Sequence, residues 1–579
     1  MNYLIIGGVA GGATAAARLR RIDEHARIVL IERGPYISFA NCGLPYHLSG
    51  TIAEREQLLV TTEERFEARY RIDVRIGTEA VAIDRARHQV VLRDVASGRT
   101  VTETYDRLLL SPGAEALRPP LPGIDGPRVH TLRNIPDLDR IVRDLDGARR
   151  AVVVGGGFIG LEVAENLRER GLRTTLVEAA AQVMAPLDEE MAAIVHASLR
   201  QHDIGLLLGE RVERFDDTGD GVVLYLSSGQ RLRADLVVLA IGVRPETALA
   251  RACALELGPR GGIRVDPFLR TSDADIYAVG DAIEVEHRVS GRAALVPLAG
   301  PANRQARLAA DNMAAPDDAQ RRRYRGALGT AVLKVFDLAV ACTGLGEDQL
   351  RAQGIACRGS ITHGASHASY YPGAQPLTLK LVWDDAGRIL GAQAIGAAGA
   401  DKRIDVIAGA MHAGLDVREL AELELAYAPP FGSAKDPVNV AGYVAGNVLD
   451  GSCPMIDWRT LRARLGGGAP LQLLDVRSAE EFAVGSLPGA RHIALETLRA
   501  RLHELDPAAP TVVFCQVGLR GYLALRVLLQ HGFADVANLS GGFKTYAWAC
   551  GRQDNPDLFD AEEIKPRPQR VIDAALAGD

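Results

Sequence analysis

Short runs of consecutive apolar residues recur along the chain, and each is followed by a glycine-rich turn and a longer helix-like stretch. The first run, YLIIGG at 3–8, leads into VAGGATAAARLRR and then into a second apolar run, RIVLIER, at 27–33. The same order returns at 149–179, where RRAVVVGGGFIGLEVAENLRERG precedes RTTLVEA. A strand, a tight turn, a helix and a second strand make a βαβ unit. The pattern therefore predicts two such units.

The turn of the second unit has the spacing of a dinucleotide-binding loop. Gly155, Gly157 and Gly160 open the helix, and Glu178 ends the following strand. Glycines permit the sharp turn and the close approach of a pyrophosphate, whose charge the helix N-terminus favours, and the acid binds ribose hydroxyls. The sequence predicts a dinucleotide site here.

The turn of the first unit follows the same plan with one departure. Gly7 and Gly12 are present and Glu32 ends the second strand, but Val9 occupies the middle position. A side chain there is expected to push the backbone slightly away from a pyrophosphate. We still predict a dinucleotide site, with less regular geometry.

The remaining chain divides by composition. Strand-like runs at 234–246 and 274–284, the latter ending near Gly280 and Asp281, precede a helical stretch at 301–314. Between 329 and 396 the pattern changes to antiparallel strands joined by Gly and Asp turns, with helices continuing to about residue 445. A separate α/β pattern then runs from 471 to 542.

Length and charge limit the functional classes. At about 150 residues per domain, a chain of 579 residues is expected to hold about four domains. The net charge is −7 with both signs interspersed, which predicts no nucleic-acid partner, although Arg18, Arg20 and Arg21 could hold a small anion. Apolar runs fall short of the roughly 18 residues needed to cross a bilayer, so we expect no membrane contact and a cytoplasmic location.

The seven cysteines do not form a disulfide framework or a metal site. They are scattered, without a Cys-x-x-Cys or Cys/His ligand spacing, and we predict no metal. Cys42 lies in SFANCGLPY beside Asn41, at the predicted start of a helix, where amide dipoles are expected to stabilise a thiolate.

Cys515 begins a second candidate site. The segment CQVGLRG, 515–521, lies between the apolar run TVVF and a helix. A short glycine-containing loop of this kind can wrap backbone N–H groups around an anion, here a thiolate or persulfide assisted by Arg520.

Together these motifs resemble the flavoprotein disulfide reductases over residues 1 to about 445 and a rhodanese domain over about 460–552. The combination is similar to the coenzyme A-disulfide reductase–rhodanese fusions, also described as NADH-dependent persulfide reductases. The implied fold is α/β, with two Rossmann-like dinucleotide-binding domains, an α+β dimerisation domain and a C-terminal α/β rhodanese domain. The expected boundaries are 1–112 with 242–324 (FAD), 113–241 (NADH), 325–445 (dimerisation), 446–459 (linker), 460–552 (rhodanese) and 553–579 (tail).

The resemblance also implies which residues hold each ligand. FAD is expected at Gly7, Gly8, Ala10, Gly11, Gly12, Glu32, Arg33, Ser111, Gly113, Gly280, Asp281, Pro297 and Ala299. NADH is expected at Gly155, Gly157, Phe158, Ile159, Gly160, Glu178 and Gly242. Coenzyme A is expected at Arg18, Arg21, Ser38, Phe39 and Lys435.

Similar reductases of small dithiols carry a second cysteine one helical turn beyond the first, and this chain lacks it. Cys42 is therefore expected to form a mixed disulfide with a substrate, or to cycle through a sulfenic acid. The resemblance implies a homodimer in which Tyr427 reaches the other subunit's cysteine. It implies a second tyrosine at Tyr370 or Tyr371, and phenols can protonate a leaving sulfur.

The rhodanese resemblance implies that Cys515 carries sulfane sulfur. Upstream elements of that domain are expected at Asp475, Arg477 and Glu480, while Ser486 stands where many such domains have histidine. The expected reaction is NADH-driven reduction of coenzyme A persulfide, polysulfide or coenzyme A disulfide. The physiological sulfur donor stays open.

Two other functions remain compatible with these residues. One is an NAD(P)H oxidase or peroxidase, although Ala10 stands where such relatives have a histidine. The other is a redox sensor or sulfur carrier in which the flavin only poises the thiols. Steady NADH consumption with a sulfur substrate would exclude the redox sensor or sulfur carrier.

Overall fold

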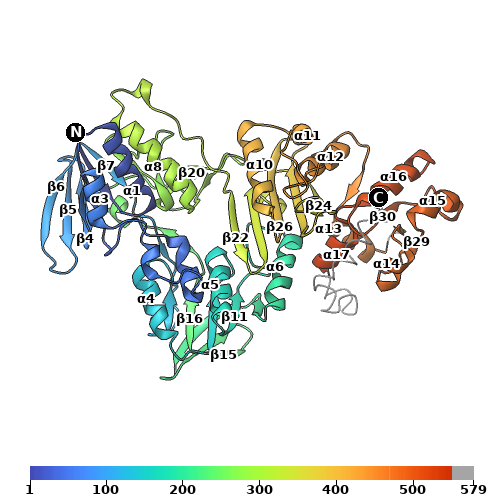
Figure 1. Ribbon diagram of the computed structural model, residues 1–579, viewed down its shortest axis with the longest axis horizontal. Coiled ribbons are helices and arrows are strands. Elements are labelled where there is room, and N and C mark those ends of the chain that lie inside the picture. The colour runs from blue at the N-terminus through green and yellow to red at the C-terminus, as the bar shows by residue number, and fades with distance from the viewer. Residues whose placement is uncertain (469, 551–579) are drawn as a thin grey trace. The chain divides into compact units, whose positions relative to one another are not determined.

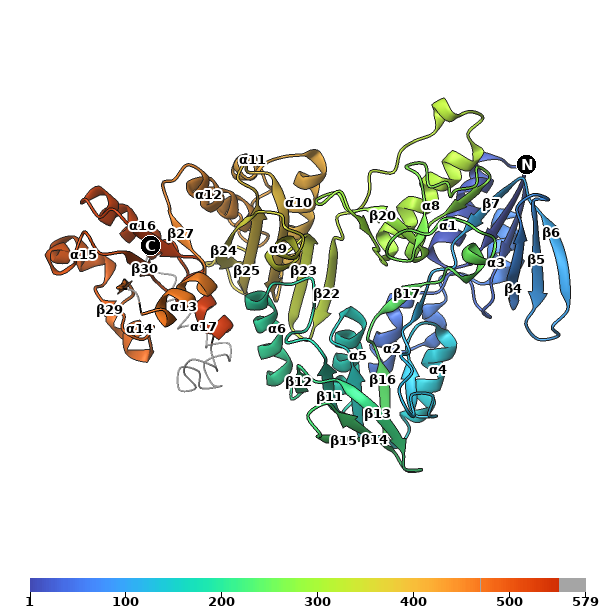
Figure 2. The same cartoon turned by 180° about the vertical axis from the view of Figure 1, so that it is seen from behind.

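The structure is a computed structural model that describes residues 1–468 and 470–550 (Figures 1 and 2). The predicted tail at 553–579 lies outside the described residues. The chain divides into two compact units: Met1–Val183 with Asp203–Gly329, and Met184–His202 with the chain from Thr330 onward. Across the described ranges, no helix combines the length and apolar character that crossing a membrane requires.

The first unit contains two five-stranded parallel sheets built on one plan. The first sheet has the order β19-β7-β1-β2-β3 and the second has the order β12-β11-β10-β16-β9. In each sheet the strand before the glycine loop is central. On one side it pairs with the next strand of its own βαβ unit, β1 with β2 and β10 with β11. On the other side β1 pairs with β7 and β10 with β16. The first sheet comprises β1 (Asn2–Ile6), β2 (Arg27–Ile31), β3 (Asp73–Arg75), β7 (Arg107–Leu110) and β19 (Ile276–Ala278). The second comprises β9 (Val129–Thr131), β10 (Arg150–Val154), β11 (Arg173–Glu178), β12 (Gly205–Leu208) and β16 (Leu236–Leu239).

Each parallel sheet is accompanied by a three-stranded antiparallel sheet. These are β4 (Thr78–Asp84), β5 (Gln89–Asp94) and β6 (Thr100–Thr104), and β13 (Val212–Asp217), β14 (Val222–Leu226) and β15 (Arg231–Ala234). Helices α1 (Ala10–Ile22) and α8 (Ala299–Ala314) pack side by side (Figures 1 and 2). The other helices of this unit are α2 (Leu44–Ser49), α3 (Glu63–Tyr70), α4 (Ile135–Asp144), α5 (Phe158–Glu169) and α7 (Ala248–Ala252). Its short remaining strands are β8 (Ala114–Ala116), β17 (Val243–Pro245), β18 (Ile263–Arg264), β20 (Ile283–Glu286) and β21 (Ala293–Ala294).

The second unit begins with α6 (Glu189–Gln201), which the sequence placed within the NADH-binding range 113–241. Its first sheet is antiparallel, as the turn pattern predicted, with the order β22-β23-β26-β25-β24. The strands are β22 (Ala331–Val335), β23 (Leu338–Gly344), β24 (Arg358–Ala365), β25 (Pro376–Trp383) and β26 (Ile389–Gly396). The helices are α9 (Glu347–Ala352), α10 (Ala400–Ala413), α11 (Val417–Glu422) and α12 (Pro437–Leu449), and the last three share an apolar core with the sheet.

A parallel sheet of order β27-β31-β30-β28-β29 forms the C-terminal part. Its strands are β27 (Met455–Ile456), β28 (Gln472–Asp475), β29 (Arg491–His492), β30 (Thr511–Phe514) and β31 (Val536–Leu539). Its helices are α13 (Trp458–Gly466), α14 (Ala479–Val484), α15 (Leu495–Arg501), α16 (Leu519–Gln530) and α17 (Gly542–Cys550). Part of the predicted linker 446–459 joins this sheet, because β27 pairs with β31. The predicted fold class is confirmed.

The C-terminal part covers an edge strand of the antiparallel sheet. Strand β24 lies at that edge, and the N–H of Ile361 on it donates to Ser540 Oγ at 3.0 Å. His363 on the same strand contacts Thr545 Oγ1 of α17 at 2.9 Å and Thr378 Oγ1 at 3.0 Å. Burial, and then the nearby Lys544, hold the pKa of His363 well below its usual value, so the ring is neutral. An open strand edge is thus closed by another part of the same chain.

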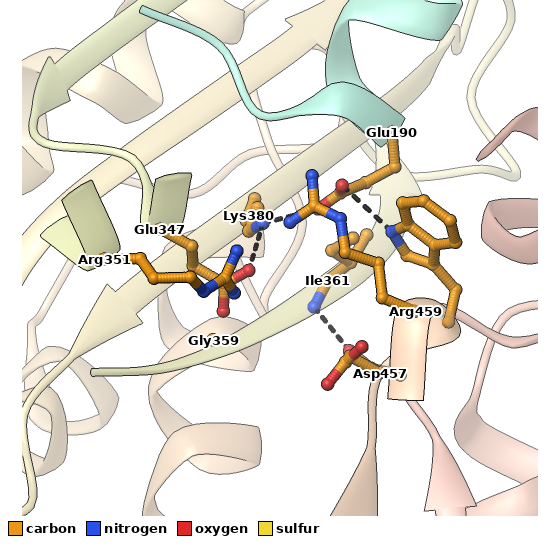
Figure 3. Close-up of a pocket in the computed structure, with 10 residues that line it drawn as sticks. Glu190, Glu347, Arg351, Gly359, Ile361, Lys380, Asp457 and Arg459 are labelled. Atoms are coloured by element: carbon orange, nitrogen blue, oxygen red, sulfur yellow. Dashed lines mark hydrogen bonds and ion pairs between the residues drawn. The ribbon is translucent and has the colours of Figure 1, made fainter. Parts of the chain in front are cut away.

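A buried ammonium joins α6 to the antiparallel sheet (Figure 3). Lys380 of β25 contacts Glu190 of α6, and its Nζ lies 2.7 Å from both Asp188 and Glu347. Burial alone lowers the pKa of Lys380, but attraction to the three carboxylates outweighs it and raises that pKa. The three acids could hold a metal ion by their spacing, yet the ammonium already lies among them.

The start of α13 attaches the C-terminal part to the same cluster. Trp458 Nε1 donates to Glu190 Oε2 at 3.0 Å. Arg459 donates to both carboxylate oxygens of Asp348 at 2.8 Å and to Glu189 at 3.2 Å. Figure 3 shows Glu190, Glu347, Lys380 and Arg459, from α6, α9, β25 and α13, lying close together. Helix α17 also packs on α6. The cluster therefore fixes three parts of the second unit to one another.

We expect Lys380→Met to destabilise the second unit. Removing the ammonium leaves buried carboxylates without their cation, which costs about 3–5 kcal/mol. The change is measured as a fall in the midpoint of thermal unfolding. Lys402→Met, at an exposed lysine of α10, is the matched control and should leave the midpoint unchanged. Equal midpoints for both variants would show that the cluster does not stabilise the fold.

Candidate functional site

The first glycine loop is held by its own acid. Gly7 has φ +99° and donates its N–H to Ile31 O at 2.8 Å. Glu32 accepts the N–H of Gly8 through Oε2 at 2.8 Å and the N–H of Gly34 through Oε1 at 2.6 Å. A Cβ at Gly12 would lie 1.8 Å from Gly7 O, so the helix can approach the turn only with glycine there.

The second loop repeats this arrangement. Gly155 has φ +108°, and a Cβ at Gly160 would lie 1.9 Å from Gly155 O. Glu178 accepts the N–H of Gly156 at 2.6 Å and that of Ala180 at 2.7 Å. Two tight turns that precede helices, each with a fixed carboxylate at the end of the next strand, fit two dinucleotides.

The substitution of Val9 for the middle glycine has little effect on the backbone. Val9 has φ −97° and ψ −140°, while the equivalent Gly157 has φ −80° and ψ −171°. A Cβ built at Gly157 meets no protein atom within 4 Å. The chain therefore follows a similar course in both loops, and the protein itself has room for the valine side chain.

The other residues expected at FAD lie around the first loop. Ser111 follows β7 and donates its N–H to Ile6 O at 2.8 Å, and a Cβ at Gly7 would lie 2.0 Å from its carbonyl oxygen. Gly280 and Asp281 form a single 3-10 turn, η3 (Gly280–Ala282), and the Gly280 N–H donates to Gln305 at 2.8 Å. The remaining positions expected at the two dinucleotides are Gly113 and Gly242, both at positive φ, Pro297 and Ala299 at the start of α8, and Phe158 and Ile159 at the start of α5. Arg33 pairs with Glu246 at 3.0 Å.

Cys42 lies in a single 3-10 turn, η1 (Asn41–Gly43), directly before α2. The thiol is free and the residue is exposed. Close packing of protein atoms around the sulfur raises its pKa, and the nearby carboxyls of Glu162 and Asp281 raise it further. Arg133 acts in the opposite direction with a smaller effect. The N–H of Cys42 itself lowers the pKa, as expected of a main-chain amide, but burial and the two carboxyls outweigh it, so the net shift is upward.

Three residues that the sequence reasoning missed surround Cys42. Tyr46 follows it by one helical turn and donates to Glu162 Oε1 at 3.3 Å. Burial raises the pKa of Glu162 to about 7; the hydrogen bond from Tyr46 lowers it, and the charge of Glu165 raises it. Because Glu162 is in α5 and α2 packs on that helix, only the contact between the two helices reveals the group. The one signal in the sequence was an acid in the second turn of the helix that follows the second loop.

Arg133 is the third missed residue. It contacts Asp281 Oδ2 at 3.2 Å and donates to Ala114 O at 2.9 Å. With its amide oriented so that both ends are satisfied, Asn41 donates to Phe39 O at 3.2 Å and accepts from Arg133 at 3.3 Å. Arg133 thus links the residue beside the thiol to the turn at Asp281, and no sequence motif marks it.

The two candidate tyrosines of the second unit contact each other. Tyr370 and Tyr427 are exposed, and their hydroxyl oxygens lie 2.8 Å apart. This hydrogen bond raises the pKa of Tyr370. Tyr371 instead packs edge-on against His367. Of the two neighbours that the sequence left open, Tyr370 is the one that contacts Tyr427.

The residues expected at coenzyme A divide between the units. Arg18 donates to Asp311 at 2.6 Å, so its charge is already paired, whereas Arg21 is exposed. Ser38 has φ +46° and Phe39 forms a bridge with Leu59. Lys435 belongs to the second unit and is exposed. Arg20 is unavailable to an anion, because its buried guanidinium donates to several main-chain carbonyls.

Cys515 follows β30, and its sulfur is buried beneath the loop it starts. Sγ accepts the Gly518 N–H at 3.1 Å, and Gly518 has φ +112°. The carbonyl of Cys515 accepts the N–H of Phe543 at 2.8 Å. A Cβ at Gly542 would lie 2.4 Å from that carbonyl oxygen, so this approach requires glycine. The loop presents an N–H donor to the sulfur, as predicted.

The arginines at this loop are already paired with acids. Arg520 donates to both carboxylate oxygens of Glu481 at 2.8 Å. Glu481 was missed, since the sequence pointed to its neighbour Glu480. Arg477 is buried against Asp475, at 2.8 Å, and donates to Gln516 of the loop at 3.1 Å.

Ser486 replaces the histidine of many rhodanese domains without leaving Asp475 unsatisfied. Its hydroxyl donates to Asp475 Oδ2 at 2.7 Å. The substitution therefore maintains a hydrogen bond to a fully buried carboxylate, at the turn after α14 and not in the cysteine loop.

The fold and the two loops define a nucleotide-dependent oxidoreductase, and comparison with known families agrees. The profile of the pyridine nucleotide-disulphide oxidoreductases matches residues 1–305, that of their dimerisation domain matches 330–437, and that of the rhodanese-like domain matches 457–548. The chain belongs to the pyridine nucleotide-disulphide oxidoreductase family, as a FAD-dependent member with a rhodanese domain.

Individual relatives share this domain combination or its reductase part. Coenzyme A disulfide reductase of Staphylococcus aureus (strain JH9) is 36% identical over 447 residues, 77% of this chain and 99% of that one. The structure of reduced Bacillus anthracis CoADR-RHD is 46% identical with a TM-score of 0.92, covering 95% of this chain and 98% of that one. An NAD-dependent persulfide reductase from A. fulgidus is 36% identical with a TM-score of 0.87, covering 94% and 100%. The resemblance inferred from the sequence is confirmed.

The fixed carboxylate of Glu178 predicts a preference for NADH. A carboxylate accepts ribose hydroxyls and repels a 2′-phosphate, so kcat/KM should be at least about tenfold higher with NADH than with NADPH. Glu178→Ala should reduce the ratio of kcat/KM with NADH to kcat/KM with NADPH, whereas Glu213→Ala, at an exposed acid of β13, should leave that ratio unchanged. Steady-state kinetics measures both, and equal efficiency with NADPH in the unmodified enzyme would refute the assignment.

The group around Cys42 predicts the pH dependence of its reactivity. Above pH 7, Glu162 is mostly ionised and opposes the Cys42 thiolate. Glu162→Gln removes that charge, so the pKa of the thiol should fall and alkylation by iodoacetamide at pH 8 should become faster. Below about pH 6 the carboxyl is protonated in the parent, and the two rates should converge. Glu56→Gln, at an exposed acid of the same unit, is the control. An unchanged pH profile would exclude Glu162 from the environment of the thiol.

Proposed function

We propose that this enzyme uses NADH to reduce coenzyme A persulfide, polysulfide or coenzyme A disulfide through Cys42, while Cys515 carries sulfane sulfur. The observation that carries the proposal is the contrast between the two thiols. Cys42 is exposed in the unit that holds both dinucleotide loops, and Cys515 is buried under an N–H-donating loop in the other. The names of the coenzyme A disulfide reductase and persulfide reductase relatives support the substrate class.

The reaction at Cys42 takes two steps. The thiolate attacks a disulfide or persulfide, so that a Cys42–S–S–R bond forms and a thiolate or hydrosulfide leaves. Two electrons and one proton then cleave that bond, releasing R–SH and restoring the Cys42 thiolate. Bound FAD, reduced by NADH, would supply those electrons.

No second cysteine is available to resolve the mixed disulfide from within the described part of this unit. The other cysteine there, Cys253, has its thiol directed to Ala250 O at 3.3 Å beside α7. The incoming sulfur compound therefore takes the place of an internal partner. Residues at the first loop, from Gly7 to Glu32 and at Asp281, would hold FAD, and the second loop with Glu178 would hold NADH.

The tyrosine pair supplies protons in this proposal. The match to a dimerisation domain supports a homodimer. In that dimer Tyr427, which is hydrogen-bonded to Tyr370, donates a proton to the sulfur that leaves Cys42 of the partner subunit. Coenzyme A would bind through exposed cations, Arg21 and Lys435 among them, with Ser38 and Phe39 beside the thiol. Arg18 contributes only if its pair with Asp311 opens.

Single substitutions distinguish the roles of the two cysteines. Cys42→Ser should lower turnover of coenzyme A persulfide at least about a hundredfold, since the nucleophile is lost, while flavin reduction by NADH continues. Cys515→Ser should spare that preformed substrate but weaken NADH oxidation driven by polysulfide. Cys253→Ser is the control for a packed cysteine. Steady-state NADH oxidation and stopped-flow flavin absorbance provide the two readouts.

Two results would contradict the proposal. If Cys515→Ser loses the preformed persulfide as completely as Cys42→Ser does, the thiols form one obligatory relay and the carrier role is wrong. If hydrogen peroxide or oxygen is turned over faster than coenzyme A persulfide, the enzyme is an oxidase or peroxidase that works through a sulfenic acid.

A further inference from the structure

Exposed apolar side chains surround the loop of Cys515. Leu519, within the loop segment, has 53% of its surface exposed, and Leu523 one turn later on α16 has 45%. Val484, at the end of α14, has 64%. These are the large exposed hydrophobic side chains in the described part of the rhodanese domain. We refer to the three residues as the apolar rim.

The ion pair between Arg520 and Glu481 brings the two helices of the rim together. Glu481 and Val484 are three residues apart on α14, and Arg520 and Leu523 have the same spacing on α16. Residues so spaced lie on one face of a helix. Because the charged members meet at 2.8 Å, the apolar members lie beside that ion pair on the two helices. Leu519 precedes Arg520 directly in the loop segment.

The charges beside the apolar rim do not favour a free anion. The carboxylate of Glu481 neutralises Arg520, and that of Asp475 neutralises Arg477. Glu480 and Glu496 are exposed nearby and add negative charge, the latter near enough to raise the pKa of Arg520. Lys544 also contacts the loop, through its main-chain N–H to Gln516 O.

The ammonium of Lys544 is directed elsewhere. It lies 4.9 Å from the ring centroid of Trp548 and interacts with His363 of β24. Burial lowers the pKa of Lys544 to about 8. The apolar rim thus adjoins arginines that are paired with acids and an ammonium that faces Trp548.

We propose, resting on the carrier role of Cys515, that this cysteine is loaded from sulfane sulfur on an uncharged organic chain, an organic polysulfide, and that the apolar rim binds that chain. An oxyanion donor such as thiosulfate needs free cations beside the loop. An uncharged chain instead gains from covering the leucines and valine, at about 25 cal/mol per Å² of apolar surface removed from water. The rim and the ion pair together set the donor class.

The loading step balances without an added oxidant or reductant. The Cys515 thiolate attacks the middle sulfur of R–S–S–S–R, forming an Sγ–S bond and expelling R–S⁻. That thiolate then attacks the outer sulfur of the bound chain, so R–S–S–R leaves. Cys515 keeps one sulfane sulfur as a persulfide anion, which the Gly518 N–H and the loop can stabilise.

Two matched donors test the proposal on the full-length enzyme. Bis(2-hydroxyethyl) trisulfide is uncharged, and bis(2-sulfoethyl) trisulfide carries a sulfonate at each end with the same reacting sulfurs. Persulfide formation on Cys515 is followed by mass spectrometry of the isolated peptide. The second-order rate should be at least about tenfold greater with the uncharged donor, because like charge opposes the sulfonates. Thiosulfate should load Cys515 poorly.

Variants assign the effect to the named residues. Glu481→Gln maintains the N-cap contact to Ser478 but frees Arg520, so it should speed loading from the sulfonated donor and thiosulfate while leaving the uncharged donor nearly unchanged. The double variant Leu519→Ser, Leu523→Ser should slow loading of Cys515 from the uncharged donor roughly tenfold and leave loading from thiosulfate unchanged. Val332→Ser, an exposed valine of β22, is the control. Unchanged reduction of preformed coenzyme A persulfide confirms that each variant is folded.

Different results would contradict the donor class and the carrier role of Cys515. Equal or faster loading from the sulfonated donor in the unmodified enzyme overturns the donor class alone. If the rim substitutions slow both donors equally, the rim supports the loop and does not select the chain, which also overturns the inference. If no donor places sulfur on Cys515, the carrier role falls as well.

Discussion

The buried ammonium of Lys380 is the interaction on which the arrangement of the second unit depends. A desolvated charge persists inside a protein only when partners replace its water, and three carboxylates do so here. Those partners come from α6, its N-cap and α9, so the charge can be satisfied only when these elements meet β25. Trp458 then supplies the remaining N–H to Glu190, and the C-terminal domain becomes part of the same cluster.

This constraint affects how sulfur can move. The rhodanese domain closes the free edge of β24, through Ser540 and Thr545, and its α17 packs on α6. Separating it would expose an unpaired strand edge and leave Glu190 short of a donor. A domain held in this way is poorly suited to detach from the rest of its unit. In the proposed function, a small thiol that accepts sulfur from Cys515 and delivers it to Cys42 would leave these contacts intact.

Most of the fold was predictable because its elements are specified locally. The two glycine loops are marked by steric needs within one loop, as at Gly12 and Gly160, where a Cβ would overlap the carbonyl of Gly7 or Gly155. The middle position has no such need, which explains why Val9 is tolerated. Cys515 was likewise identifiable, since strand, loop and helix follow one another directly.

What the sequence could not provide were contacts between distant segments. Glu162, Tyr46 and Arg133 surround Cys42 only because α2 packs on α5 and Arg133 reaches Asp281. For the same reason the sequence did not reveal the net direction of the thiol pKa: the local amide lowers it, but burial and then two carboxyls from elsewhere in the chain raise it. The sequence favoured Tyr370 slightly over Tyr371, and the contact between the hydroxyls of Tyr370 and Tyr427 supports that preference.

The two thiols lie in different surroundings. Burial, and then the carboxyls of Glu162 and Asp281, oppose ionisation of the Cys42 thiol and raise its pKa, while Arg133 favours the thiolate. A thiol that must hold a persulfide anion needs donors directed at sulfur instead, and Gly518 provides one at 3.1 Å. With Arg477 and Arg520 paired to Asp475 and Glu481, the Cys515 loop offers its sulfur a backbone N–H donor rather than net charge. In the proposed loading step, selection of the incoming donor would then depend on the surface beside the loop, where the apolar rim lies.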